Sequence, residues 1–509
     1  MTERDTHDYV IVGAGTAGCV LAHRLSRDED TGVLLLEAGE PDDKEEIHIP
    51  AMFPHLFKSE VDWDYSTAPQ PGLNGRAEYY PRGKTLGGSS AINAMMYVRG
   101  NPWDYDRWER LGNEGWSYDD LLPYFCRAED FEGGASEFHG ADGPLRITRQ
   151  DDFTEQSRAL VEAAEEVGFE YNDDFNAGRQ TGVGPFHLTA DGDQRESTAV
   201  AYLRPVLDRE NLTAETGAHV TRVLFDGDRA VGVEYEQEGR RHTVEAEREV
   251  ILSAGAVDSP KLLLLSGIGP ADHLDDHGIE PRIDAPGVGR NLQDHLLTHA
   301  VYECTEDFEL PPSSNLGENG AFERTDPGLP APDLQYFLAP VYFMNHGFDN
   351  PEGKGFSIGA TFLRPKSRGR ITLRSADPFD DPVIDPQYFD EREDLDRLVE
   401  GIKRAREIGR ADALDEYRGE ELWPGEAVQS DEGIAEHVRE TVQTVYHPVG
   451  TCKMGDDAMA VVDDRLRVHG VDGLRVVDAS IMPRITSGNT NAPVIAIAEK
   501  AADLIREDA

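Results

Sequence analysis

A single strand–turn–helix near the start of the chain constrains the fold more than any other stretch. The apolar residues 9–12 predict a buried parallel strand, and Gly13, Gly15 and Gly18 follow it at G-x-G-x-x-G spacing. Apolar residues then recur at helical spacing through residues 20–25. In such a unit the first glycine allows a tight turn, the second lets the backbone approach a pyrophosphate, and the third lets the helix pack on the strand.

A second predicted strand, residues 32–36, ends at the acidic residue Glu37. Glu37 lies about twenty residues after the last glycine, where a carboxylate can bind ribose hydroxyl groups. A carboxylate here favours an unphosphorylated ribose, as in NAD or FAD, over NADP. An ordinary glycine turn is the alternative for the motif alone. The two strands, the glycines and the acid together indicate a dinucleotide-binding fold, with NAD and FAD both open.

Length and cysteine content narrow the class of protein. A chain of 509 residues predicts two or three domains. Its cysteines, Cys19, Cys126, Cys304 and Cys452, form no CxxC pair, which favours buried thiols in a reducing compartment and predicts no metal site. The polar residues 1–8 contain no secretory hydrophobic segment, and no run reaches the ~20 apolar residues of a membrane span. We therefore expect a cytoplasmic protein without an integral membrane span.

The charge balance is strongly acidic. Asp and Glu number 98 against 49 Lys and Arg, so the net charge is −49, and only nine of the basic residues are lysines. The acids are spread along the chain, which is typical of proteins from a high-salt cytoplasm, where salt screens self-repulsion. An ordinary acidic protein is the alternative. Nucleic-acid binding is disfavoured because no basic stripe is present.

A second glycine-rich stretch, residues 82–100, contains Gly87, Gly88, Ser89 and Ser90 before an apolar run. Serine hydroxyls and loop N–H groups can bind phosphate or ring oxygens. A glycine turn with a helix N-cap is the alternative.

This stretch and residues 255–270 resemble the two signatures of the glucose–methanol–choline (GMC) family of flavin oxidoreductases. The resemblance runs from Tyr9 to the C-terminus, and the choline dehydrogenases and related alcohol dehydrogenases are the members that the chain looks most like. It implies FAD rather than NAD. It also implies an α/β fold, with a Rossmann-like FAD-binding domain and an α+β substrate-binding cap built on an antiparallel sheet.

The resemblance also implies a division of the chain. Residues 8–300 are expected to form mainly the FAD-binding region, with cap segments inserted at about 50–80 and 140–195. Residues 301–455 are expected to form mainly the cap, including a strand at residues 370–373. Residues 456–509 are expected to return to the FAD-binding domain.

Cofactor residues follow from the same resemblance. They are Gly13, Gly15, Thr16, Ala17, Gly18, Glu37, Ala38, Thr85, Gly87, Gly88, Ser89, Asn93, Ala94, Met95, Val220, Ala254, Asp478, Ala479, Asn491 and Pro493. Some family members carry a histidine, bonded to the flavin, immediately before the asparagine that corresponds to Asn93. Here that position is Ile92, so we expect non-covalent FAD.

The predicted catalytic residues are His447 and Asn491. Pro448 biases His447 toward an extended backbone, and His447 matches the catalytic histidine of the family. Asn491 lies 44 residues later and matches a position held by histidine or asparagine, which could hydrogen-bond the substrate oxygen but not act as a base. The alternative for Asn491 is a helix start before Pro493. His295 is expected to be structural.

The resemblance implies FAD-dependent oxidation of an alcohol to an aldehyde or ketone. His447 would take the hydroxyl proton as hydride moves to flavin N5, and an unidentified electron acceptor would reoxidise the flavin. The substrate is choline or another primary alcohol. Choline would need an aromatic cage and a carboxylate, and the candidates for the cage are Trp63, Tyr342, Phe343 and Tyr446. An FAD-containing hydroxynitrile lyase and a non-catalytic flavin-binding protein are the alternatives, and the oligomeric state is undefined.

Overall fold

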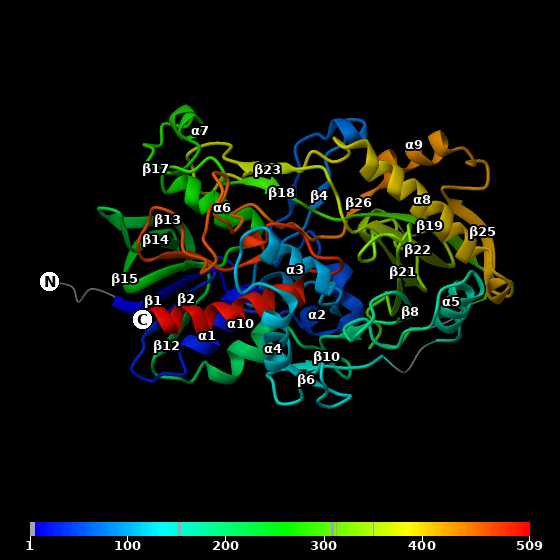
Figure 1. The fold of residues 1–509 in the computed structure, drawn as a ribbon, viewed down its shortest axis with the longest axis horizontal. Helices are drawn as coiled ribbons and strands as arrows, with labels where there is room; N and C mark the ends of the chain where they lie inside the picture. Colours follow the sequence, from blue (N-terminus) through cyan, green and yellow to red (C-terminus); the bar gives the residue numbers. More distant parts are fainter. Residues whose placement is uncertain (1–5, 151–153, 307–309, 312, 350) are drawn as a thin grey trace.

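Two seven-stranded sheets dominate the structure, one toward each end of the molecule (Figure 1). The computed structural model describes residues 6–150, 154–306, 310–311, 313–349 and 351–509. The first five residues of the polar segment expected at residues 1–8 lie outside this description. Among the described residues, no helix is long and apolar enough to cross a membrane.

The first sheet contains the strand–turn–helix predicted at residues 9–25. Its strand order is β12 (Leu212–Glu215), β2 (Val33–Leu36), β1 (Thr6–Val12), β15 (Arg240–Leu252), β14 (Arg229–Gln237) and β13 (His219–Asp226), and β27 (Leu474–Val476) also pairs with β15. The pairs among β12, β2, β1, β15 and β27 are parallel. Every residue of β2 is buried, as its continuous apolar sequence requires of a strand covered on both faces.

Two helices from opposite ends of the chain lie together on this sheet. α1 (Thr16–Leu25) packs beside α10 (Asn491–Asp508), and α6 (Gly255–Leu265) follows β15 (Figure 1). The buried Glu499 carboxylate of α10 accepts hydrogen bonds from Arg24 of α1, from Arg127 and from the Tyr202 hydroxyl. These contacts join the C-terminus to the dinucleotide-binding half.

The second sheet is antiparallel throughout. Its order is β25 (Arg418–Trp423), β19 (Leu296–Cys304), β22 (Lys354–Phe362), β21 (Leu334–Ala339), β20 (Asn319–Glu323) and β8 (Gly182–Pro185), and β26 (Gln443–Thr444) also pairs with β19. α8 (Arg392–Gly409) packs on it through Leu395, Leu398, Ile402 and Ala405, whose three- and four-residue spacing forms one apolar stripe. α5 (Glu155–Glu166) and α9 (Asp431–Thr441) pack beside α8. The domain limits given above stay a prediction.

The strand expected in the cap sheet at residues 370–373 was assigned to the wrong sheet. β23 (Gly369–Thr372) lies between β18 (Arg290–Leu292) and β24 (Val383–Asp385) in a separate three-stranded sheet. Gly289, with φ of +75°, lets the backbones meet, because a Cβ there would lie 2.1 Å from the carbonyl oxygen of Ile371. Alternation of apolar residues predicts that a segment forms a strand. The strand with which it pairs depends on close approaches between backbones, such as the one at Gly289.

Shorter elements complete the chain. They are α2 (Glu45–His48), α3 (Pro102–Arg110), α4 (Tyr118–Ala128), α7 (Ala271–Asp276), η1 (Pro50–Leu56), η2 (Pro71–Leu73), η3 (Gly88–Ala91), η4 (Ala199–Leu203), η5 (Arg204–Val206), η6 (Asn345–Gly347), η7 (Asp412–Leu414), η8 (Ala479–Ile481), β3 (Tyr65–Ser66), β4 (Tyr79–Tyr80), β5 (Met96–Tyr97), β6 (Glu129–Phe131), β7 (Leu145–Ile147), β9 (His187–Leu188), β10 (Ala190–Asp191), β11 (Gln194–Arg195), β16 (Ile268–Gly269) and β17 (Ile283–Asp284). Among the described residues the four cysteines form no disulfide; Cys19 and Cys452 are buried, whereas Cys126 and Cys304 are partly exposed.

Candidate active site

One continuous cavity extends from the first sheet, which belongs to the dinucleotide-binding half, to the second, antiparallel sheet, which is the cap sheet. At one end it is lined by residues that follow β1 and β2, and at the other by Leu297 and His299 of β19 and Phe337 of β21. Most of the predicted cofactor residues line it: Gly13, Gly15, Thr16, Ala17, Glu37, Ala38, Gly88, Ser89, Asn93, Ala94, Met95, Val220, Ala254, Asp478, Ala479 and Asn491.

Four predicted cofactor residues stand behind the cavity wall instead. Gly18 packs α1 on the first turn, because a Cβ there would lie 1.9 Å from the carbonyl oxygen of Gly13. Gly87 donates its backbone N–H to the Ala14 carbonyl at 2.8 Å. The Thr85 hydroxyl donates to the Glu40 carbonyl at 2.9 Å, and Pro493 is buried in the first turn of α10. These residues shape the cavity without lining it.

The two glycine-rich stretches meet at the amino end of α1. A Cβ on Gly88, whose φ is +52°, would lie only 2.7 Å from the Cα of Gly15. None of the described side chains caps α1 at Gly15, so its first backbone N–H groups remain available. A helix N-terminus between bare backbone loops suits an anionic pyrophosphate. The residues present therefore fit a dinucleotide.

Glu37 is held at the end of β2 by two backbone groups. Its carboxylate accepts hydrogen bonds from the N–H of Ala14 at 2.7 Å and from that of Gly39 at 2.9 Å. Burial raises the pKa of Glu37 to about 7, against these N–H groups, which favour the charged form. Donation by ribose hydroxyls would stabilise the charged carboxylate further.

His447 forms the centre of a buried pair of histidines. Its Nδ1 lies 3.0 Å from Nδ1 of His295, whose Nε2 lies 3.0 Å from the carbonyl oxygen of Leu363. A carbonyl can only accept, so His295 Nε2 carries the hydrogen and its Nδ1 accepts from His447. The neutral His447 ring therefore carries its hydrogen on Nδ1 and leaves Nε2 unprotonated. The structural role expected for His295 thus includes selecting the tautomer of His447.

The surroundings keep His447 neutral. Burial, followed by the neighbouring His295 and the Arg82 guanidinium, holds the pKa of His447 well below its usual value. A histidine with a lowered pKa is unprotonated at neutral pH and gains a proton only in acid. Asp294 anchors the backbone, because its Oδ1 accepts from the His447 N–H at 3.0 Å.

The structure places Asn489, not Asn491, beside His447. The Nδ2 of Asn489 lies 3.4 Å from Nε2 of His447, and its Oδ1 accepts from Nε2 of Gln335 in β21 at 3.2 Å. Asn491 begins α10 and its Oδ1 accepts from the Thr16 hydroxyl at 2.8 Å. Asn489 is thus the asparagine in direct contact with His447, whereas Asn491 lines the same cavity and its pairing with His447 across the substrate stays a prediction. Asn491 faces α1 because it lies on the helix, whereas Asn489 lies in the preceding loop.

The wall on the cap side is aromatic and aliphatic. Two hydrophobic clusters of buried and partly buried residues contribute to it: Phe53, Phe57, Leu316, Phe343 and Tyr446 in one, and Met96, Leu297, Phe337, Phe343 and Val445 in the other. Sequence reasoning missed most of these residues, because their spacing is that of ordinary core positions. Asn489 had a signal, since it stands in the same short motif as Asn491.

The aromatic cage suggested for choline is assembled only in part. Trp63, Phe343 and Tyr446 all line the cavity, and Trp63 also stacks on Tyr65 and contacts His219 of β13. Tyr342 does not line the cavity, and its hydroxyl donates to the Lys354 carbonyl at 2.8 Å.

The nucleotide cradle, the buried histidine pair and the antiparallel cap define a flavin-dependent oxidoreductase. The chain belongs to the GMC oxidoreductase family, whose N-terminal region matches residues 7–297 and whose C-terminal region matches residues 365–498. It is accordingly an enzyme that oxidises the CH–OH group of an alcohol with FAD.

Relatives and solved structures cover nearly the whole chain. Mitochondrial choline dehydrogenase of Homo sapiens is 45% identical over 99% of this chain and 90% of its own length. Alcohol dehydrogenase [acceptor] of Pseudomonas putida is 44% identical over 98% of this chain and 95% of its own. Pyridoxine 4-oxidase from Mesorbium loti superposes with a TM-score of 0.94 at 38% identity, covering 98% of both chains. Formate oxidase of Aspergillus oryzae RIB40 reaches 0.93 at 29% identity, covering 100% of this chain and 99% of its own.

The contacts of the two asparagines predict different consequences of their removal. Asn489→Ala should slow flavin reduction by alcohol about 100-fold, the usual cost of losing one hydrogen-bond donor at a reacting oxygen. Asn491→Ala should keep that rate within about threefold and act on cofactor retention instead, because the Asn491 side chain accepts a hydrogen bond from Thr16 of α1. Anaerobic stopped-flow reduction of the two flavin-loaded variants measures this difference, and equal losses of rate would contradict the distinction.

Proposed function

We propose that the protein oxidises an uncharged, largely apolar primary alcohol. In this proposal His447 is the base, Asn489 donates a hydrogen bond to the reacting oxygen, and FAD is held without a covalent bond. The observation that carries the proposal is the cavity itself, in which the unprotonated nitrogen of His447 lies beside an apolar wall.

Charge separates this substrate class from choline, the substrate named in several relatives. The acidic residues among the described lining are Glu37, Asp258 and Asp478. Glu37 and Asp478 bind backbone N–H groups of the dinucleotide half, and Asp258 accepts from the Tyr65 hydroxyl. The cap-side wall thus offers no described carboxylate to a cation, and Arg82 adds a positive charge to the lining. A cation moved there from water would lack a counter-charge.

The residues around the reacting oxygen divide the chemistry between them. His447 Nε2 takes the hydroxyl proton, and its neutral state at working pH leaves it ready to do so. Asn489, turned by Gln335, donates to the oxygen as negative charge develops there. Bound FAD supplies the acceptor for the hydride. The aromatic wall excludes water and orients the carbon chain of the alcohol.

A matched pair of alcohols tests the substrate class. The uncharged isostere of choline, dimethylbutanol with carbon in place of nitrogen, should reduce the flavin at least about tenfold faster than choline at equal concentration, since an uncompensated charge costs 1.4 kcal/mol or more. Benzyl alcohol and linear primary alcohols extend the series under anaerobic conditions. Faster reduction by choline would contradict the proposed class. Readmitting oxygen then separates an oxidase from a dehydrogenase that needs another acceptor.

His447→Ala is the control for the reaction itself. The variant should retain FAD and lose flavin reduction by every alcohol, because the base is gone while the nucleotide cradle is intact. Full activity in His447→Ala would contradict the assignment of the base.

Non-covalent FAD is supported by Ile92, whose hydrocarbon side chain lines the cavity where some family members carry a bonded histidine. Glu37→Gln should raise the Kd for FAD at least about tenfold, because an amide cannot replace both carboxylate acceptors. Glu40→Gln is the control, since the exposed Glu40 does not line the cavity. Acid precipitation of the wild type should leave the flavin in the supernatant; flavin in the pellet would contradict non-covalent binding.

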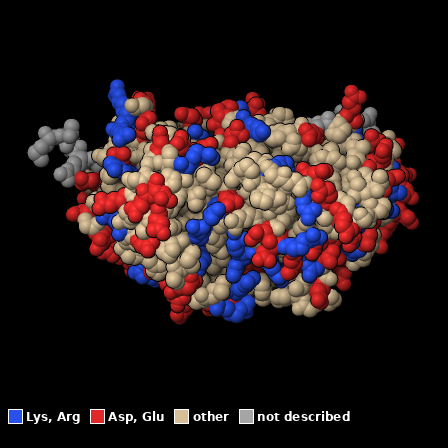
Figure 2. All heavy atoms as spheres, turned by 90° about the horizontal axis from the view of Figure 1, so that it is seen from above, with Lys and Arg blue, Asp and Glu red and all other residues tan. Residues whose placement is uncertain are grey.

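The surface charge supports a high-salt cytoplasm as the working environment. Figure 2 shows acidic side chains spread across the face seen from above, in keeping with the net charge of −49. The screening length falls from about 10 Å at 0.1 M salt to about 3 Å at 1 M, which weakens self-repulsion. The melting temperature should therefore rise between these concentrations of NaCl, and sucrose of equal osmolality should not reproduce the full rise. An unchanged melting temperature would contradict the salt requirement.

A further inference from the structure

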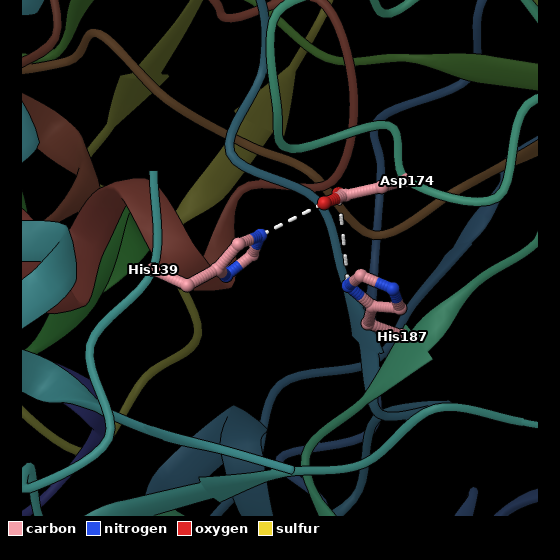
Figure 3. Close-up of side chains that lie close together, drawn as sticks. All are labelled: His139, Asp174 and His187. Carbon is pink, nitrogen blue, oxygen red and sulfur yellow. Dashed lines mark hydrogen bonds and ion pairs between the residues drawn. The ribbon is translucent and has the colours of Figure 1, made fainter. Parts of the chain in front are cut away.

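Three side chains from separate segments lie close together. They are far from His447 in the sequence and take no part in the proposed reaction. His139 precedes β7, Asp174 lies in the loop after α5, and His187 begins β9 (Figure 3). One donor atom of each residue lies within 4.8 Å of the others. His139 and His187 are 4% and 2% exposed, so the cluster is a built interior feature and not a chance surface grouping.

His139 is oriented by carboxylates on both sides. Its Nδ1 lies 2.9 Å from Oε2 of Glu129, and its Nε2 lies 2.9 Å from Oδ2 of Asp174. Glu129 is also paired with the buried Arg99. When Glu129 accepts the hydrogen of Nδ1, the lone pair of Nε2 points at the Asp174 oxygen. Two acceptors can face each other so closely only if a proton or a cation lies between them.

His187 has no such explanation within the protein. Neither of its ring nitrogens has a hydrogen-bond partner among the described residues, although the residue is almost completely buried. Its Nδ1 points toward Oδ1 of Asp174 at 3.9 Å, which is too long for a hydrogen bond (Figure 3). A buried imidazole nitrogen without a partner is costly, and its direction toward the carboxylate indicates a shared third group.

We propose that His139 Nε2, His187 Nδ1 and the Asp174 carboxylate bind a divalent transition-metal ion of the zinc type. Two imidazoles and one carboxylate form a donor set that such ions favour. Bonds of roughly 2.0–2.1 Å in tetrahedral geometry place donors about 3.3 Å apart. His139 Nε2 lies 2.9 Å from Oδ2 of Asp174, His187 Nδ1 lies 3.9 Å from Oδ1 of Asp174, and one donor atom of each residue lies within 4.8 Å of the others. Side-chain movements of about an ångström or more would bring the three donors to that spacing. Water would complete the coordination.

Glu129 supports the ion without touching it. A ligating histidine commonly donates its second ring N–H to a carboxylate, which fixes the tautomer and the ring direction. His139 and Glu129 have this relation at 2.9 Å. The expectation of no metal site came from the cysteines; these ligands stand 35 and 13 residues apart, at a spacing typical of no short motif.

The position of the cluster assigns the ion a structural task. β9, which begins with His187, pairs with β5, and Met96 of β5 lines the substrate side of the cavity. The ion would hold the loops that carry His139 and Asp174 against β9 and, through β9, against β5, which lines the cavity. It takes no part in the proton or hydride transfer, so this inference stands apart from the proposed substrate.

Metal content measured on the flavin-loaded protein tests the site. Tag-free protein is equilibrated with micromolar Zn²⁺, passed through gel filtration in molar NaCl to remove ions held by surface acids, and analysed by inductively coupled plasma mass spectrometry. Wild type and the exposed control His55→Gln should retain about one zinc per chain, whereas His187→Gln and Asp174→Asn should retain less than about one tenth of that. Zinc K-edge absorption should show two imidazole ligands in the wild type.

Chelation gives a second readout, which the wild type supplies by itself even if a variant does not fold. EDTA treatment should lower the melting temperature of wild type and of His55→Gln, and should leave that of His187→Gln unchanged. Wild type without retained zinc, or equal zinc in wild type and His187→Gln, would overturn the proposal. Either result would make His139 a protonated bridge between Glu129 and Asp174.

Discussion

The close approach of two backbones at Gly15 and Gly88 is the constraint on which the rest of the structure depends. A Cβ on Gly88 would lie 2.7 Å from the Cα of Gly15, so these segments can meet only without side chains. Their contact closes the floor of the cavity over the amino end of α1. It also ties residues near position 90 to the first strand–turn–helix. β5 and the segment that holds His447 then contribute lining residues on the cap side of the same cavity.

Burial converts this geometry into chemistry. His447, His295 and Asp294 are all within the interior, where the carbonyl of Leu363 can select one tautomer through two successive rings. In water the same imidazoles would exchange protons freely and carry no fixed direction. The interior also lowers the pKa of His447, so the nitrogen that faces the cavity stays available as an acceptor at neutral pH. Burial matters in the same way in the cluster around His187. A buried ring nitrogen there has no hydrogen-bond partner among the described residues, and this is the reason for proposing a metal ion at that place.

Features that depend on residues close together in the sequence could be predicted, whereas features that depend on contacts between distant segments could not. The strand β1, the helix α1 and the carboxylate of Glu37 were predictable, because period, glycine spacing and strand ends are local properties. Asn489 was overlooked in favour of Asn491, two residues away in the same motif. Helix phase decides between them, because α10 begins at Asn491 and turns its side chain toward Thr16. Residues 370–373 were predicted as a strand and assigned to the wrong sheet, since the partner of β23 is set by a backbone contact at Gly289.

The sequence by itself determined the nucleotide-binding unit, the flavin family and the histidine expected to act as base. Each depends on residues close together in the chain or on long motifs in a recognisable order. Only the tertiary structure decided which asparagine meets His447, that Phe53, Leu297 and Phe337 share one apolar wall, and that His139, Asp174 and His187 converge. Those outcomes depend on contacts between distant segments, and neither spacing nor composition records the distance between side chains that only folding brings together.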